Sequence, residues 1–166
     1  MITPDFARTM AAYNAEMNRR LYGAAARLSD DIRRADRGAF WGSIHGTLAH
    51  LLWGDGNWMH RFAGWPANGV HMRNSPEWQP DFTELRAARM RMDTDIIDWA
   101  KTVEQSWLDS DLVWYSAALG RELRRQRGFL LTHMFNHQTH HRGQAHALIT
   151  AAGEQTGDTD LFIVVP

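Results

Sequence analysis

The sequence predicts an all-α protein, a four-helix bundle that forms a single domain over residues 1–166. Three observations favour this class. Four long segments carry apolar residues at helical spacing, and the length of 166 residues suits one domain with a hydrophobic core but not two of ordinary size. Hydrophobic residues make up 44% of the chain and charged residues 22%, which is usual for a globular protein.

The first predicted helix covers about 24 residues and begins at Pro4. Thr3 is a suitable N-cap, and proline is favoured at the first helical position. Apolar residues then recur on one face, at Phe6, Met10, Tyr13, Met17, Leu21 and Leu28. Residues 30–38 are mostly charged, and we predict that they form a solvated turn.

A second helix is predicted from about Ser43 to Phe62. Its apolar face comprises Ile44, Leu48, Leu51, Leu52, Trp58, Met59 and Phe62. Gly54 and Gly56 lie in its interior and weaken it by up to about 1 kcal/mol each. Residues 64–80 have no regular apolar spacing and contain three prolines, so we predict a long loop, of the kind that often carries function.

The remaining elements follow from the same patterns. Residues 81–103 predict a third helix, whose charged face of Arg86, Arg89, Arg91, Asp93, Asp95 and Asp98 is interpreted as solvated surface. Residues 107–124 predict a short irregular hairpin with a turn at Gly120. The fourth helix is expected from Arg124 or Arg127 to Ala152, before Gly153. Four long helices in one domain indicate a bundle, and the apolar tail 161–166 is expected to pack on it or on a partner subunit.

Charge and hydropathy exclude several classes of partner. A formal net charge of −1 gives no broad attraction to nucleic acid or to anionic membranes. No stretch approaches the roughly 18 apolar residues that span a bilayer, and residues 1–6 lack the pattern of a secretory signal. We therefore expect a cytoplasmic protein with no nucleic-acid or membrane partner. Because the chain has no cysteine, a metal site would have to use imidazole, carboxylate and water.

Nine histidines stand out, and the densest group lies on the fourth predicted helix. His137 and His141 are four residues apart, about 6 Å along the helix axis, so both imidazoles can reach one ion. His133 and His137 have the same spacing, but His133 and His141 are about 12 Å apart along the axis. Only one of the two pairs can therefore bind the ion.

A third ligand has to come from another helix, and His50 is the best candidate. It lies within the apolar run of the second helix, where a buried imidazole needs a polar partner. His45 competes with it on the same helix, but its position near the helix start predicts that it is exposed.

Two stretches resemble the DinB-like (damage-inducible, YfiT-related) family of metal-binding four-helix bundles. They are residues 43–52 (SIHGTLAHLL), followed by Asp55 and Trp58, and residues 133–144 (HMFNHQTHHRGQ), of which HHRGQ is the most specific part. The resemblance extends over nearly the whole chain. It implies an up-down-down-up bundle, a nickel or zinc ion held by His50, His137 and His141, and a homodimer. Members with known chemistry are thiol S-transferases that use low-molecular-weight thiols.

Three neutral imidazoles leave at least one coordination position for water or substrate. The hypothesis is therefore a metal-dependent transferase or hydrolase, and the alternative is a non-catalytic, stress-related metal or ligand-binding homodimer. Asp55 is a candidate general base or helix-surface carboxylate, and Arg142 a candidate partner for an anionic substrate or an interhelical salt bridge. A di-iron carboxylate site is excluded because no glutamate is followed three residues later by histidine. Metal affinity is expected to fall near pH 6.5, where free imidazole becomes protonated.

Overall fold

Side-chain caps mark the starts of three long helices in the computed structural model, which describes residues 1–116 and 119–165. Thr3 Oγ1 accepts a hydrogen bond from Phe6 N (3.2 Å) at the start of α1 (Pro4–Ala26). Ser43 caps α3 (Ile44–Ala63) and Asp81 caps α4 (Phe82–Lys101) in the same way. Each cap satisfies a backbone N–H that the first turn leaves unpaired. These helix starts match the predicted ones to within a residue.

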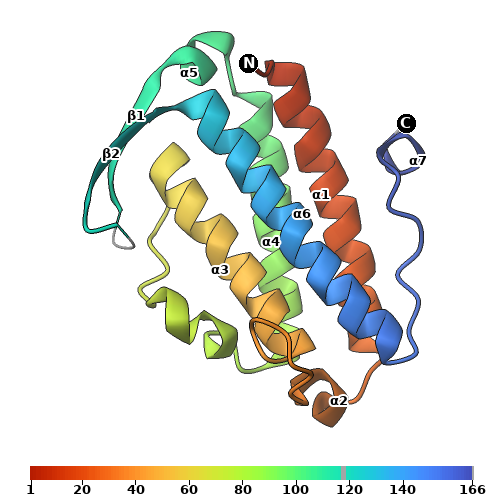
Figure 1. Ribbon diagram of the computed structural model, residues 1–166. Coiled ribbons are helices and arrows are strands. Elements are labelled where there is room, and N and C mark those ends of the chain that lie inside the picture. Colours follow the sequence, from red (N-terminus) through yellow and green to blue (C-terminus); the bar gives the residue numbers. More distant parts are fainter. Residues whose placement is uncertain (117–118, 166) are drawn as a thin grey trace.

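The four longest helices, α1, α3, α4 and α6 (Arg127–Ala151), pack against one another. Helix α1 contacts α4 and α6, and α3 contacts the same two helices from the other side. Figure 1 shows α1 and α6 running in one direction and α3 and α4 in the opposite one. The predicted helical class is confirmed at this level, with a small two-stranded sheet added to it.

The shorter elements differ from the prediction in places. Residues 30–38 contain a short helix, α2 (Asp30–Arg34), where a turn was expected. Ser29 caps this helix, and acidic residues at its start and arginines at its end complement the helix dipole. The long loop contains a 3-10 helix, η1 (Met72–Glu77), which packs against α3.

The predicted hairpin is present and covers one side of the molecule. After α5 (Gln105–Asp109), strand β1 (Asp111–Ser116) pairs antiparallel with β2 (Arg121–Gln126). Gly120 has a φ of 62°, a backbone conformation that glycine adopts without strain. Figure 1 shows the hairpin reaching from the start of α6 along the side of α3, and the Trp114 ring lies 6.3 Å from that of Trp58 on α3.

The C-terminal tail lies beside α1 but is only partly packed. It forms a short helix, α7 (Leu161–Val164), that contacts α1. Phe162 and Ile163 are 80% and 53% exposed, so these two residues do not pack on the bundle. Their packing on a partner subunit stays a prediction. Pro166 lies outside the described residues. Within residues 1–116 and 119–165, every helix is too short or too polar to pass through a lipid bilayer.

A polar layer divides the apolar core into two halves. One apolar cluster joins the first half of α1 to the second halves of α3 and α4 and the first half of α6. The other joins the opposite ends of the same four helices. Between them lie the buried polar side chains Asn14, Asn18, Asp55, Arg89, Gln138 and Arg142.

The position of Arg89 in this layer contradicts the prediction that its face of α4 is solvated. The side chain is 1% exposed, and its guanidinium pairs with Asp55 (2.5 Å) and Asp93 (2.7 Å). Asn18 also donates to Asp93 (2.9 Å). A buried charge is tolerated only with such partners, and the two carboxylates come from α3 and α4 itself.

We predict that Asp55→Asn destabilises the fold by about 3 kcal/mol or more, because it leaves the buried Arg89 charge with one carboxylate instead of two. Urea denaturation followed by circular dichroism measures the change. The matched control is Asp98→Asn, which breaks an exposed ion pair with Lys101 and is expected to change stability by less than about 1 kcal/mol. Equal effects of the two substitutions would show that the buried Arg89–Asp55 pair is not needed for the stability of the fold.

Candidate metal centre

Three imidazoles from two helices converge at one point. His50 on α3 and His137 and His141 on α6 each offer one ring nitrogen, and these three nitrogens lie within 4.8 Å of one another. The distances between ring centroids are 4.4 Å for His137–His141, 4.7 Å for His50–His141 and 5.5 Å for His50–His137. The structure therefore brings together all three residues that the sequence predicted as ligands.

The antiparallel packing of α3 and α6 produces this convergence. His50 faces His141, and one turn further along α3 Gly54 faces His137. A Cβ atom at Gly54 would lie 2.7 Å from Cε1 of His137, closer than carbon atoms approach in real structures. Glycine in the middle of α3 thus provides the space that the His137 ring occupies.

A hydrogen bond from η1 fixes the orientation of His50. Ser75 Oγ donates to the carbonyl of Met72 (2.6 Å), so it accepts from His50 Nδ1 (2.8 Å). With the proton on Nδ1, Nε2 keeps its lone pair. Outer partners of this kind orient ligating histidines in metal sites.

His141 of α6 is oriented in a similar way, whereas Nδ1 of His137 has no partner among the described residues. His141 Nδ1 donates to Oε1 of Gln144 (2.8 Å), which leaves the Nε2 lone pair free, and that atom lies 3.1 Å from Nε2 of His137. Two ring nitrogens this close can share one proton or bind one cation. The donor chemistry of the cluster therefore fits a transition-metal ion.

Burial keeps the rings in the form that binds metal. The Trp41 ring stacks on His50 at 3.8 Å between centroids, and the Trp53 ring stacks on it at 5.5 Å. Desolvation, followed by the charges of the neighbouring histidines, lowers the pKa of His50 and of His137 to about 3. Desolvation also lowers the pKa of His141. The imidazoles are therefore neutral at neutral pH.

The rings open onto a cavity of about 930 Å³ between α3, α6 and the hairpin. Its wall includes the aromatic residues Trp41, Trp53, Trp58, Trp114, Phe40 and Phe129. The same cavity contains the three clustered histidines as well as His133 and His140. An ion held by the cluster would thus be reachable by a small molecule.

Asp55 and Arg142, the predicted catalytic residues, do not line this cavity. Asp55 is fully buried and paired with Arg89 in the polar layer, so it is not the surface carboxylate of the alternative interpretation. Arg142 is buried on the opposite side of α6, donates to Thr139 Oγ1 (3.2 Å) and borders a separate cavity of about 470 Å³. Their catalytic roles stay predictions.

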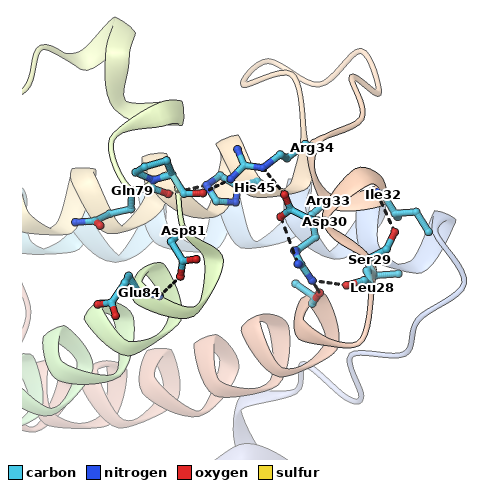
Figure 2. A network of polar contacts seen from close by, with 12 residues as sticks. Leu28, Ser29, Asp30, Ile32, Arg33, Arg34, His45, Gln79, Asp81 and Glu84 are labelled. Atoms are coloured by element: carbon cyan, nitrogen blue, oxygen red, sulfur yellow. Dashed lines mark hydrogen bonds and ion pairs between the residues drawn. The ribbon is translucent and has the colours of Figure 1, made fainter.

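The two competing histidines lie outside the cluster. The His133 ring meets Trp58 edge-on at 5.1 Å and is 6.1 Å from His137. His45 was predicted to be exposed, but it is buried and its Nε2 donates to the backbone carbonyl of Gln79 (2.7 Å). Figure 2 shows the His45 ring within a network that joins the start of α3 to Arg34 of α2 and to the segment before α4. This segment covers the start of α3, which accounts for the burial.

Sequence reasoning missed the residues that hold the rings in place. Ser75 lies in the loop 64–80, where length alone suggested function, and nothing in the sequence pairs it with His50. Gly54 carried a usable signal, since glycine inside a helix costs about 1 kcal/mol and needs a compensating reason. Gln144 belongs to the HHRGQ stretch. Nothing in the sequence indicated that Trp41 packs against a histidine ligand.

Comparison with known proteins agrees with the resemblance found in the sequence. A model of the DinB family matches residues 1–164. Protein DinB of Bacillus subtilis (strain 168) is 24% identical over 160 residues, which cover 94% of this chain and 91% of that protein. No solved structure matches the chain. Because the family model extends over nearly its whole length, the chain belongs to the DinB family.

Proposed function

We propose that His50, His137 and His141 hold one divalent transition-metal ion, nickel or zinc, in a bundle of up-down-down-up order. The convergence of three neutral ring nitrogens within 4.8 Å carries this proposal. Imidazole is a preferred ligand of both metals, and the chain has no thiolate to compete with it. The hydrogen bonds of Ser75 and Gln144 support it further, because they orient two rings as ligands without touching the ion.

We infer that the centre is catalytic and acts in the transfer of a low-molecular-weight thiol or in hydrolysis. Three protein ligands and an open position are typical of catalytic rather than structural zinc sites. The bound metal would supply a Lewis acid that lowers the pKa of a thiol or water. Trp41 and Trp53 stack against the His50 ring and shield it from water, and the cavity that they line leaves room for a substrate next to the histidines.

Turnover assays distinguish this proposal from the non-catalytic homodimer. The metal-loaded protein is expected to convert at least one substrate in a panel of thiol conjugations and ester or amide hydrolyses, and His137→Ala to abolish that turnover. A loaded protein that is inert across the whole panel would favour a protein that only binds metal or ligand.

The first prediction about metal binding concerns the metal content of His137→Ala. Protein purified without a histidine tag is expected to contain about one divalent ion per chain by elemental analysis, and the variant far less. Loss of an outer partner alone weakens metal binding about 10- to 100-fold, so loss of a ligand is expected to exceed about 100-fold. His133→Ala is the control, because His133 has the same spacing from His137 but is not in the cluster. Equal metal loss in both variants would contradict the assignment.

The second prediction concerns Gly54→Ala. The added methyl group collides with the His137 ring, so the ring has to move and metal affinity, measured by competition with a chelator, is expected to fall. Gly23→Ala in α1 is the matched control, because no atom lies within 4 Å of a Cβ there. That variant is expected to bind metal normally and to gain up to about 1 kcal/mol of stability. Unchanged affinity in Gly54→Ala would show that His137 is not a ligand.

The third prediction is the pH dependence of metal binding. Protons compete with the metal only below the pKa of each folded imidazole, and burial lowers that value to about 3 for His50 and His137. The expected loss of affinity near pH 6.5 therefore moves to lower pH. Chelator competition between pH 8 and pH 4, with circular dichroism as a check on folding, measures the midpoint. A midpoint at or above 6.5 would indicate exposed ligands.

A further inference from the structure

The cavity next to the three histidines carries positive charge without a counter-charge. Arg61 on α3 and Arg121 and Arg125 on β2 line it. No aspartate or glutamate is among the described residues of its wall. A cation at the histidines would add to this charge. The cavity is therefore suited to a negatively charged ligand.

Arg61 is the best placed of the three arginines. It is half-buried in the last turn of α3, and its guanidinium lies 4.8 Å from the centroid of the Trp58 ring. It has no hydrogen bond or ion pair with any residue that the structure describes, whereas Arg89 has two carboxylates. Burial lowers the pKa of Arg61, which indicates a desolvated charge that an anion would stabilise.

The distance between Arg61 and the histidines sets the length of the ligand. Arg61 follows Gly54, which faces His137, by seven residues, or about 10 Å along the helix axis. Side chains on a helix lean toward its N-terminus, and the stacking on Trp58 shows that Arg61 does so. Between the two positions, Trp58, Trp114 and His133 form an aromatic wall.

We propose that this cavity binds a small organic anion whose carboxylate pairs with Arg61 while its other end lies at His50, His137 and His141. A guanidinium binds a carboxylate through two parallel hydrogen bonds, and the aromatic wall packs against the apolar carbons between the two ends. The reactive end of this ligand rests on the proposed function, but the carboxylate site does not. Arg61, rather than Arg142, is thus the specificity-determining arginine of the cavity.

A pair of thiols that differ only in charge tests the proposal. Cobalt-loaded protein is titrated with 6-mercaptohexanoate and with 6-mercaptohexan-1-ol, and binding is followed by the change in the visible absorption of the metal. The carboxylate is expected to bind at least about tenfold more tightly, as is usual for a hydrogen bond between charged groups. Arg61→Gln is expected to bring the ratio close to one, and Arg61→Lys to retain part of the preference. The control is Arg91→Gln, which removes an exposed arginine of α4 and is expected to leave the ratio unchanged.

A second titration tests the carboxylate site at Arg61 independently of the metal centre. Metal-free protein is titrated with hexanoate and with hexan-1-ol, and binding is followed by tryptophan fluorescence. A preference for hexanoate that Arg61→Gln removes supports the carboxylate site even when no metal binds to the histidines. Cobalt binding without any preference for carboxylate, or a preference that survives in Arg61→Gln, would overturn the role of Arg61 and leave the metal centre intact.

Discussion

The antiparallel contact between α3 and α6 is the constraint on which the site depends. It sets His50 opposite His141, Gly54 opposite His137 and Trp58 opposite His133. Each residue along a helix turns the side chain by about 100°, so a shift of α3 by one residue would direct His50 away from α6. The cluster consequently requires that these two helices keep one register.

The polar layer fixes the register of α3 against α4, its other neighbour in the bundle. Two apolar clusters alone would tolerate some sliding of the helices, because apolar packing is not directional. Arg89 is different, since a shifted register would separate its buried charge from Asp55. We interpret the layer as specifying the alignment of α3 with α4 rather than as adding net stability, because buried ion pairs often gain little over apolar packing.

Local patterns explain what the sequence predicted and long-range contacts explain what it did not. The starts of α1, α3 and α4 were predictable because Thr3, Ser43 and Asp81 cap their own helices. The spacing of His137 and His141 is also local, whereas the choice between this pair and His133–His137 needed the resemblance to a family. Helical spacing does not report what covers a helix face, so Arg89 and His45 were both wrongly expected to be exposed. The hydrogen bond between Ser75 and His50 joins residues 25 positions apart, and no sequence pattern predicts it.

The charges around the cavity also constrain how a bound thiol or water would lose its proton. Asp55 is directed into the polar layer and engaged with Arg89, and no carboxylate is among the described residues lining the cavity. The neutral imidazoles of the cluster would themselves be engaged as ligands. Of the cavity's remaining side chains, His133 and His140 are the imidazoles closest to the cluster. A site of this kind therefore favours a substrate whose acidity the metal raises directly, and a thiol, which is more acidic than water, meets that requirement.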